Sequence, residues 1–312
     1  MLCLSLIFVA TVGPGHAVAQ TNYDEAKAAY DSRDFAKAYE MLTTLVKQGS
    51  PDAQNLLGTM YENGEGVRPD LSKAVALYEK AAKQGQSEAQ LNLGTLYENG
   101  EGVPKDAKQA AQWYRLAAEN GEILAQYSLG LMYREGRGVP RNDKEAAKWL
   151  GLVADKGFAI AQINLAIMYL HGEGVVQNAK KAAAFLQKAA ERNHPVAQNM
   201  LGLLHLKGEG VAKNDKEAAR FFLRAAVQGL SDAQFNLAQM LEAGRGVRKD
   251  NSEAAKWYAK AAQQGDPDAE YKLGLMYRDG LGVKKNESEA RRWLQEAAQG
   301  GHEDAKRALQ GF

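Results

Sequence analysis

Residue types that often carry covalent chemistry are scarce in this sequence, and none of them stands in a catalytic spacing. The one cysteine, Cys3, lies inside an apolar N-terminal run, so a chain processed after that run would hold no thiolate, disulfide or cysteine metal site. The S-x-x-K, G-x-S-x-G, H-E-x-x-H and G-x-x-x-x-G-K patterns are all missing. The sequence therefore names no catalytic residue and disfavours an enzyme.

Four histidines after residue 20 are the remaining candidates for metal binding or proton transfer: His171, His194, His205 and His302. His171 ends one helical segment and His205 lies in the next copy of the same segment, so the two could be neighbours. A zinc site needs three or four protein ligands, and no further ligand accompanies this pair. We therefore expect no metal site and no cofactor.

A glycine-x-glycine-valine motif, as in Gly136-Arg137-Gly138-Val139, could be mistaken for a loop that cradles phosphate. It recurs in seven copies, always directly after a helical segment. Glycine commonly closes a helix there because it adopts the left-handed conformation without strain. We therefore interpret the motif as a helix end, and the second glycine as a further unusual dihedral in the loop.

The elements that must position these residues repeat with a fixed period of 36 residues. Each copy predicts a first helix that ends at the glycine motif and a second helix that begins after an Asp or Asn N-cap. The second helices end at a glycine, or at Asn193, which also tolerates the left-handed region. Such hairpins bury a core only by stacking, so the pattern predicts an all-α solenoid of α/α hairpins. The copies are marked by Ala53-Gln54, Ala89-Gln90, Ala125-Gln126, Ala161-Gln162, Ala197-Gln198 and Ala233-Gln234, and then by Ala269-Glu270 and Ala305-Lys306.

The N-terminus is typical of an export signal. Leu2–Val12 is apolar, and Ala17-Val18-Ala19 fits a cleavage site before Gln20. No Lys or Arg precedes the apolar run, which leaves open a translation start upstream of Met1. We expect a bacterial protein, periplasmic or secreted after cleavage near Ala19. The net charge of +1 indicates no nucleic-acid partner, and no apolar run is long enough to span a bilayer.

The repeated pattern A-Q-x-x-L-G-x-x-Y-x-x-G-x-G-V, followed by E-A-A-x-W-Y-x-x-A-A-x-x-G, resembles the Sel-one-like repeat, a relative of the tetratricopeptide repeat. Ala166 and Ala238 replace the glycine of the pattern, while His205 and Leu241 replace its tyrosine. The resemblance implies a right-handed superhelix that serves as a scaffold for protein partners, and exported bacterial members suggest envelope signalling or host interaction. Some cysteine-rich relatives have been associated with β-lactam binding and cleavage, but the disulfide of each repeat is missing here.

The resemblance and the period together predict four parts. Residues 1–19 form the signal peptide, residues 20–49 a tetratricopeptide-like capping hairpin, residues 50–301 seven repeats of 36 residues, and residues 302–312 a capping half-repeat. The capping hairpin is expected to pair a helix over Tyr23–Tyr30 with one over Phe35–Lys47.

A second stripe on the first helices indicates where a partner would bind. The first helix of the fourth repeat is apolar nearly all round, which indicates that both its faces are covered. The same positions in the first repeat are polar. By resemblance to tetratricopeptide arrays, this stripe lines a concave surface, and an apolar band edged by polar residues predicts a binding groove. The predicted partner-binding residues are Leu124, Tyr127, Leu131, Ile160, Ile163, Ile167, Leu170, Val196, Asn199, Leu203, Leu206, Phe235 and Tyr271.

Three functions remain open at this point. The first is an exported, non-enzymatic and monomeric scaffold that binds a protein or peptide in its concave groove. The second is a hydrolase acting on a β-lactam or an amide through an unrecognised site. The third is a structural subunit of an envelope assembly. The missing motifs disfavour the second, and the central apolar stripe favours the first over the third. On the first reading, Ile163, Ile167 and Leu203 are ligand contacts rather than core residues.

Overall fold

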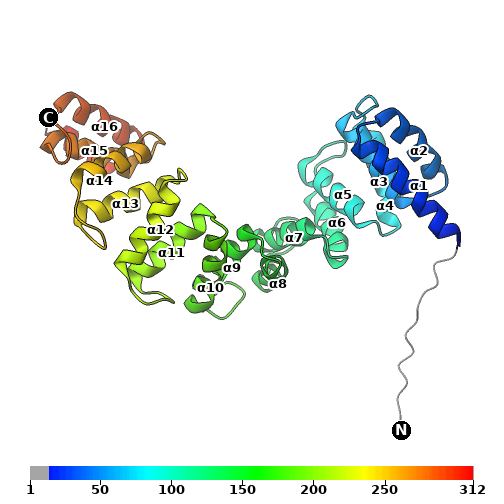
Figure 1. Cartoon of the computed structure of the whole chain (residues 1–312), viewed down its shortest axis with the longest axis horizontal. Coiled ribbons are helices and arrows are strands. Elements are labelled where there is room, and N and C mark those ends of the chain that lie inside the picture. Colours follow the sequence, from blue (N-terminus) through cyan, green and yellow to red (C-terminus); the bar gives the residue numbers. More distant parts are fainter. Residues whose placement is uncertain (1–13, 312) are drawn as a thin grey trace, which may run out of the picture. The chain divides into compact units, whose positions relative to one another are not determined.

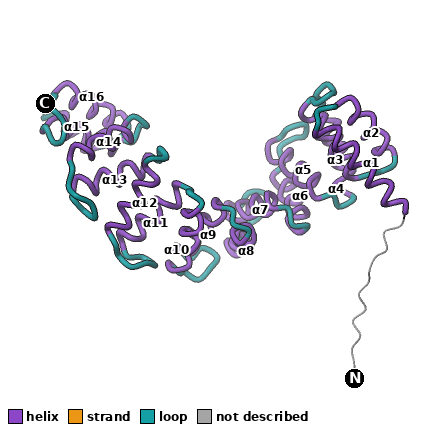
Figure 2. Tube along the Cα trace, in the orientation of Figure 1, coloured by secondary structure: helices purple, strands orange, loops and turns teal. Residues whose placement is uncertain are grey.

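The helical period of the sequence is followed throughout residues 14–311, which are the residues that the computed structural model describes. Within this range every regular element is an α-helix, and successive helices pack as hairpins joined by short loops (Figures 1 and 2). The all-α class is thereby confirmed. The apolar run Leu2–Val12 lies outside the described residues, so the export signal stays a prediction.

The helices group into two compact parts, residues 1–149 and residues 150–312, which we treat separately. The N-terminal part contains α1 (Pro14–Asp31), α2 (Phe35–Lys47), α3 (Pro51–Asn63), α4 (Leu71–Lys83), α5 (Ser87–Asn99), α6 (Ala107–Glu119) and α7 (Ile123–Glu135). Helix α8 (Asp143–Asp155) contains the division. The C-terminal part contains α9 (Ala159–His171), α10 (Ala179–Glu191), α11 (Pro195–Lys207), α12 (Asp215–Ala226), α13 (Ser231–Ala243), α14 (Asn251–Ala262), α15 (Pro267–Asp279), α16 (Glu287–Gln299) and α17 (Glu303–Leu309). The predicted pair of helices in residues 20–49 is present, and α1 begins earlier than expected, at Pro14.

Alanine seams let these helices stack closely. On α12, Ala218 and Ala225 have no exposed surface, and Ala254 and Ala261 take the same role on α14. Helix α12 therefore packs against both α11 and α13, and α14 packs against both α13 and α15. Helices α12 and α14 thus each hold two neighbouring first helices, as the stacking of hairpins requires.

Polar caps begin the second helices where the sequence predicts them. The Asp70 side chain accepts a hydrogen bond from the backbone N–H of Lys73 at 3.0 Å, and Asn214 caps α12 in the same way. Side chains accept backbone N–H groups at all seven predicted caps: Asp70, Asp106, Asn142, Asn178, Asn214, Asp250 and Asn286. Because these donors have no partner inside the helix, the caps fix where each second helix begins.

The second glycine of the loop motif is required at Gly246 and Gly210 by a close approach as well as by its dihedral. Gly246 has φ of 68°, and a Cβ placed on it would lie 2.2 Å from the carbonyl oxygen of Asp215. The loop between α13 and α14 thus rests on the first turn of α12. A Cβ placed on Gly210 would lie at the same distance, 2.2 Å, from the carbonyl oxygen of Ala179. The motif therefore docks these two loops on the preceding hairpins.

The glutamine of the repeated Ala–Gln step clamps three helices together, a role that the sequence did not assign. Gln234 on α13 donates to the carbonyl oxygen of Ala226 on α12 at 3.1 Å. Its side-chain oxygen accepts from Gln264, which follows α14, at 2.8 Å. Gln198 and Gln228 repeat this contact at 2.8 Å one hairpin earlier. These bonds satisfy the buried side chains of Gln198 and Gln234, whereas the side-chain oxygens of the buried Gln126 and Gln162 have no partner among the described residues.

Asn193 takes the left-handed conformation that its position predicts, with φ of 63°. Its side-chain oxygen also accepts from Gln198 at 2.9 Å, and its amide nitrogen lies 3.3 Å from the Gln228 side-chain oxygen. The asparagine therefore joins the neighbouring glutamine clamp, which a glycine at this site would not do.

Candidate partner-binding surface

The predicted binding residues divide into three groups by exposure. Leu124 in the N-terminal part is 61% exposed, and Ile160 and Val196 in the C-terminal part are 55% and 38% exposed. Two residues, Ile163 and Asn199, are buried. The others are half-buried, and they are Tyr127 and Leu131 in the N-terminal part and Ile167, Leu170, Leu203, Leu206, Phe235 and Tyr271 in the C-terminal part.

The expectation that Ile163 contacts a ligand rather than the core is wrong. Ile163 is only 7% exposed and belongs to the core cluster that holds Ala197 and Leu201 of α11. Asn199, 6% exposed, takes the same repeat position on α11, and its side-chain oxygen accepts from Asn236 of α13 at 3.0 Å. This position faces the neighbouring first helix, so its side chain is covered by the stack.

Phe235 and Tyr271 occupy the same repeat position as Ile163 and Asn199, and their rings pack against other aromatic rings of this chain. The Phe235 ring packs on Tyr258 with centroids 5.6 Å apart, and the Tyr271 ring stacks on His302 at 4.3 Å. These contacts take the ring faces away from solvent. They leave a smaller surface in the C-terminal part, which we call the apolar face: Ile160, Ile167, Leu170, Val196, Leu203 and Leu206.

Two residues of the apolar face, Leu170 and Leu206, stand at a repeat position that changes together with a position on the second helix. In the α13–α14 hairpin, the buried Tyr258 hydroxyl donates to Glu242 on the first helix at 2.7 Å. In the α11–α12 hairpin the corresponding residues are Phe222 and Leu206. The α9–α10 hairpin has Leu186 and Leu170 at these positions. In these two hairpins the second-helix residue offers no hydrogen bond, and the first-helix residue is apolar. A leucine also stands on the second helix where the first-helix residue is Arg134 or Arg278, so the glutamate alone depends on the hydroxyl.

The same polar pair recurs in the N-terminal part. Tyr114 donates to Glu98 at 2.7 Å, and Thr95 lies 3.2 Å from the same hydroxyl. Burial, together with the carboxylate, raises the pKa of Tyr114 far above its usual value, so the hydroxyl stays a neutral donor. Tyr258 is shifted in the same direction for the same reasons. These pairs make a polar first-helix surface in their hairpins.

Charges lie on the C-terminal side of the apolar face. Lys272 on α15 lies 3.3 Å from Glu242 on α13, an ion pair with both side chains about one third exposed. Asp232 on α13 and Asp268 on α15 follow Ile160 and Val196 at the same repeat position, and both are exposed. The result is an apolar patch with a charged margin, the arrangement found where proteins bind partners.

A metal site or a membrane-spanning helix finds little support among residues 14–311. In that range no three His, Cys, Asp or Glu side chains converge as metal ligands, and His205 instead stacks on Phe221 with centroids 5.7 Å apart. None of the helices described there is long and apolar enough to cross a bilayer.

The repeat pattern decides the family. The family model for the Sel1 repeat matches residues 51–86, 87–122, 123–158, 159–194, 195–230, 231–266 and 267–302 in direct succession. The chain belongs to the Sel1 repeat family. Sel1 repeats form helical solenoids that typically mediate protein interactions, and the family is generally a non-enzymatic scaffold. The resemblance noted in the sequence is confirmed.

Two solved bacterial structures share the fold at clear sequence identity. A protective antigen of uropathogenic Escherichia coli with this repeat fold is 35% identical, with a TM-score of 0.81 over 87% of this chain. The chain spans 58% of that antigen's length. A Sel1 repeat protein from Oxalobacter formigenes is 32% identical, with a TM-score of 0.76 over 96% of this chain and 90% of its own. No protein of curated function matches the chain in sequence.

Proposed function

We propose that this protein is an exported bacterial scaffold that holds a protein or peptide partner against the apolar face of its C-terminal part. The observation that carries the proposal is the exposure of Ile160 and Val196 on successive first helices, beside the half-buried Ile167, Leu203 and Leu206. Exposed apolar side chains scattered singly need no explanation, whereas a contiguous set favours a partner.

The geometry supports a protein or peptide partner rather than a small substrate. The apolar face is spread over α9 and α11, and no nucleophile or metal ligand set accompanies it among the described residues. Sel1 repeats typically bind proteins, which agrees with an extended surface of this kind. The proposal also includes a concave groove and a monomeric state. It places the protein in the periplasm or outside the cell, after cleavage of the chain near Ala19.

The test places a photo-crosslinking amino acid at Ile160 in cells that produce the full chain. We expect crosslinks to a discrete partner in the envelope or culture fraction, because this side chain is the most exposed of the apolar face. The double variant Ile160→Ser and Val196→Ser should then weaken capture of that partner while melting close to wild type, since surface changes usually stay within about 0.5 kcal/mol.

Leu124→Ser is the matched control, because Leu124 has the same repeat position in the N-terminal part and is at least as exposed. It should leave capture by the C-terminal part unchanged. Undiminished capture by the double variant would refute the proposed surface, and an intact Met1 form recovered only from the cytoplasm would refute export.

A further inference from the structure

The last full hairpin, α15–α16, departs from the other repeats at the position of the buried glutamine. Glu270 on α15 stands at this position, where the six preceding repeats have glutamine: Gln54, Gln90, Gln126, Gln162, Gln198 and Gln234. Glu270 is nearly as buried as these glutamines, with 7% of its surface exposed. The contacts open to its carboxyl group therefore decide whether it holds a proton.

Glutamine at this position joins its own first helix to the second helix of the preceding hairpin. In five hairpins its side-chain nitrogen donates to the carbonyl oxygen eight residues earlier, at 3.1–3.4 Å: Gln90 to Ala82, Gln126 to Ala118, Gln162 to Ala154, Gln198 to Ala190 and Gln234 to Ala226. The corresponding acceptor for Glu270 is the carbonyl oxygen of Ala262 at the end of α14. An ionised carboxylate has no hydrogen to donate, so only the protonated form of Glu270 can make this bond.

The side chain that would donate to the oxygen of this residue is missing as well. In four hairpins an amide side chain after the second helix donates to the glutamine oxygen, from Gln84, Asn120, Gln228 and Gln264. The corresponding residue after α16 is Gly300, which has no side chain. An ionised Glu270 would therefore lack this donor and would also leave the Ala262 carbonyl oxygen without the bond of the other hairpins.

The charges that act on Glu270 favour the same form. Burial, which is the largest cause, and the negative charges of Glu296 on α16 and Asp266 before α15 raise the pKa of Glu270 above its ordinary value of 4.5. Burial disfavours an isolated carboxylate, and two neighbouring carboxylates add repulsion. The protonated form therefore persists to a higher pH than in an exposed glutamate.

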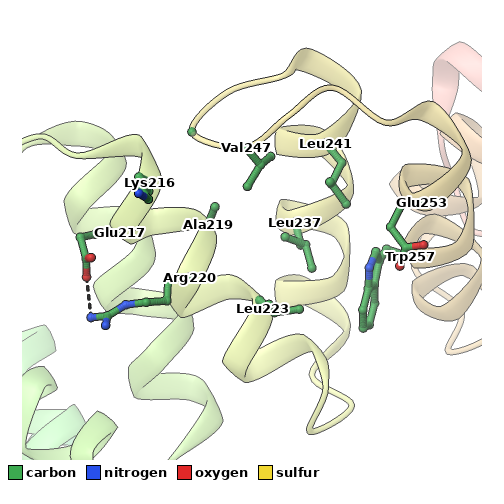
Figure 3. Close-up of a pocket in the computed structure, with 11 residues that line it drawn as sticks. Lys216, Glu217, Ala219, Arg220, Leu223, Leu237, Leu241, Val247, Glu253 and Trp257 are labelled. Atoms are coloured by element: carbon green, nitrogen blue, oxygen red, sulfur yellow. Dashed lines mark ion pairs between the residues drawn. The ribbon is translucent and has the colours of Figure 1, made fainter.

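The other charged side chains of the helices around Glu270 have partners elsewhere. On α14, Glu253 pairs with Lys256 and lines a cavity of about 470 Å³ beside Trp257, in the first half of the helix that Ala262 ends (Figure 3). Lys260 lies over the Trp257 ring, 3.8 Å from its centroid. The remaining pairs on α15, α16 and α17 are Lys272 with Glu242, Arg278 with Asp279, Arg291 with Glu287, Arg292 with Glu289 and Glu296, His302 with Asp268, Lys306 with Glu303, and Arg307 with Asp304. Among the described residues, no cation is therefore placed to offset a charge on Glu270.

We propose that Glu270 is a pH-sensitive switch between the last full hairpin and the preceding one. Its protonated carboxyl group donates to the carbonyl oxygen of Ala262, and loss of the proton leaves two acceptors together and loosens α15 on α14. Because folding raises the pKa of Glu270, its stabilising contribution is complete below about pH 4.5 and is lost as the pH rises through the raised value. Helix α15 also carries Lys272, which pairs with Glu242 at the charged margin of the apolar face, so the switch acts beside that surface.

The test compares the full chain with Glu270→Gln, which restores the donor of the other repeats and cannot ionise. Hydrogen exchange of the backbone amides of α15 and α16 is measured for both proteins at the same pH, so that the intrinsic exchange rates cancel. We expect equal exchange near about pH 4. Near about pH 8, wild type should exchange faster, by about tenfold for each unit by which the pKa is raised. Equal exchange at both pH values would overturn the proposal.

Glu303→Gln is the matched control, because it makes the same acid-to-amide change at an exposed residue of α17. Lys306 lowers the pKa of Glu303, so this variant should not slow exchange as the pH rises. A matching effect in Glu303→Gln would refute the switch, because net charge alone would then explain it. The carboxyl carbon signal that Glu270→Gln removes from the carbon-13 spectrum should titrate in wild type above pH 4.5, and a lower value would also refute the switch. Neither measurement uses the partner of the apolar face, so either proposal can fail without the other.

Discussion

The pairing of Leu206 with Phe222 can be exchanged for the glutamate and tyrosine of the next hairpin. Phe222 has no exposed surface, and Leu206 is half-buried above it. One hairpin later the corresponding side chains are Tyr258 and Glu242, joined at 2.7 Å. If the apolar face arises from this coupled choice, Phe222→Tyr and Leu206→Glu should rescue each other.

The expected energies follow from the burial of the two sites. Phe222→Tyr alone buries a hydroxyl without a partner, which costs about 1–3 kcal/mol of unfolding free energy. Leu206→Glu alone removes part of the burial of a leucine and costs about 1 kcal/mol. In the double variant the hydroxyl donates to a carboxylate, and such a bond contributes about 1.5–3 kcal/mol. The double variant should therefore lose about 1.5–3 kcal/mol less than the sum of the single changes.

The assay is a urea titration of wild type, both single variants and the double variant, followed by circular dichroism. A coupling energy below about 0.5 kcal/mol, the range found for independent sites, would refute the reasoning. The folded double variant also replaces part of the apolar face with polar side chains. It should then lose the partner identified by crosslinking at Ile160.

Three further predictions concern the hairpin stack. Gly229→Ala should lower the free energy of unfolding by about 1–2 kcal/mol, because of its left-handed backbone alone. Gly246→Ala should lower it by about 1–3 kcal/mol more, because the added Cβ meets the Asp215 carbonyl oxygen. Equal urea midpoints for the two variants would contradict this. Arg192→Gln should stabilise by about 1 kcal/mol, because it offers the buried, unpartnered Gln162 side-chain oxygen the bond that Gln228 gives Gln198; an unchanged midpoint would count against the clamp. Burial and the hydrogen bond to Glu65 raise the pKa of Tyr30 from 10.0 to about 12, so its stabilising contribution is complete below pH 10 and is lost as the pH rises toward 12. Because burial also raises the pKa of Tyr114 and Tyr258, Tyr30→Phe should reduce the alkaline slope in stability by the contribution of one tyrosine and leave the rest, and an unchanged slope would contradict this.

Most of the fold could be predicted from the sequence because each local signal has a direct backbone cause. Asp70 and Asn214 mark helix starts through hydrogen bonds to unpaired N–H groups, and Gly246 marks a loop by its positive φ. The role of Gln234 could not be predicted in this way. Its two hydrogen-bond partners lie on α12 and after α14, and only the stack brings them together.

The candidate site could be predicted only in part. The helical phase of a residue gives the direction of its side chain, but it does not show whether a neighbouring helix covers that side chain. Ile160 and Ile163 lie about 60° apart around α9, so the pattern places both on one stripe. The structure separates them: Ile160 is exposed, while the neighbouring first helix covers Ile163. Predicting that difference needs the distance between successive first helices, which depends on the packing of the whole hairpin.

A repeat protein nevertheless contains its own comparison set, and one feature described above can be read from it. Glutamate at the position of Glu242 always accompanies a tyrosine at the position of Tyr258, and leucine accompanies an apolar residue in the two preceding hairpins. Where the first helix has Arg134 or Arg278, the second-helix residue is a leucine, so the glutamate occurs only opposite a hydroxyl. Such joint changes are expected of two positions in direct contact, as the hydrogen bond from Tyr258 to Glu242 shows. A change at one repeat position therefore carries information about the side chain that it meets on the other helix.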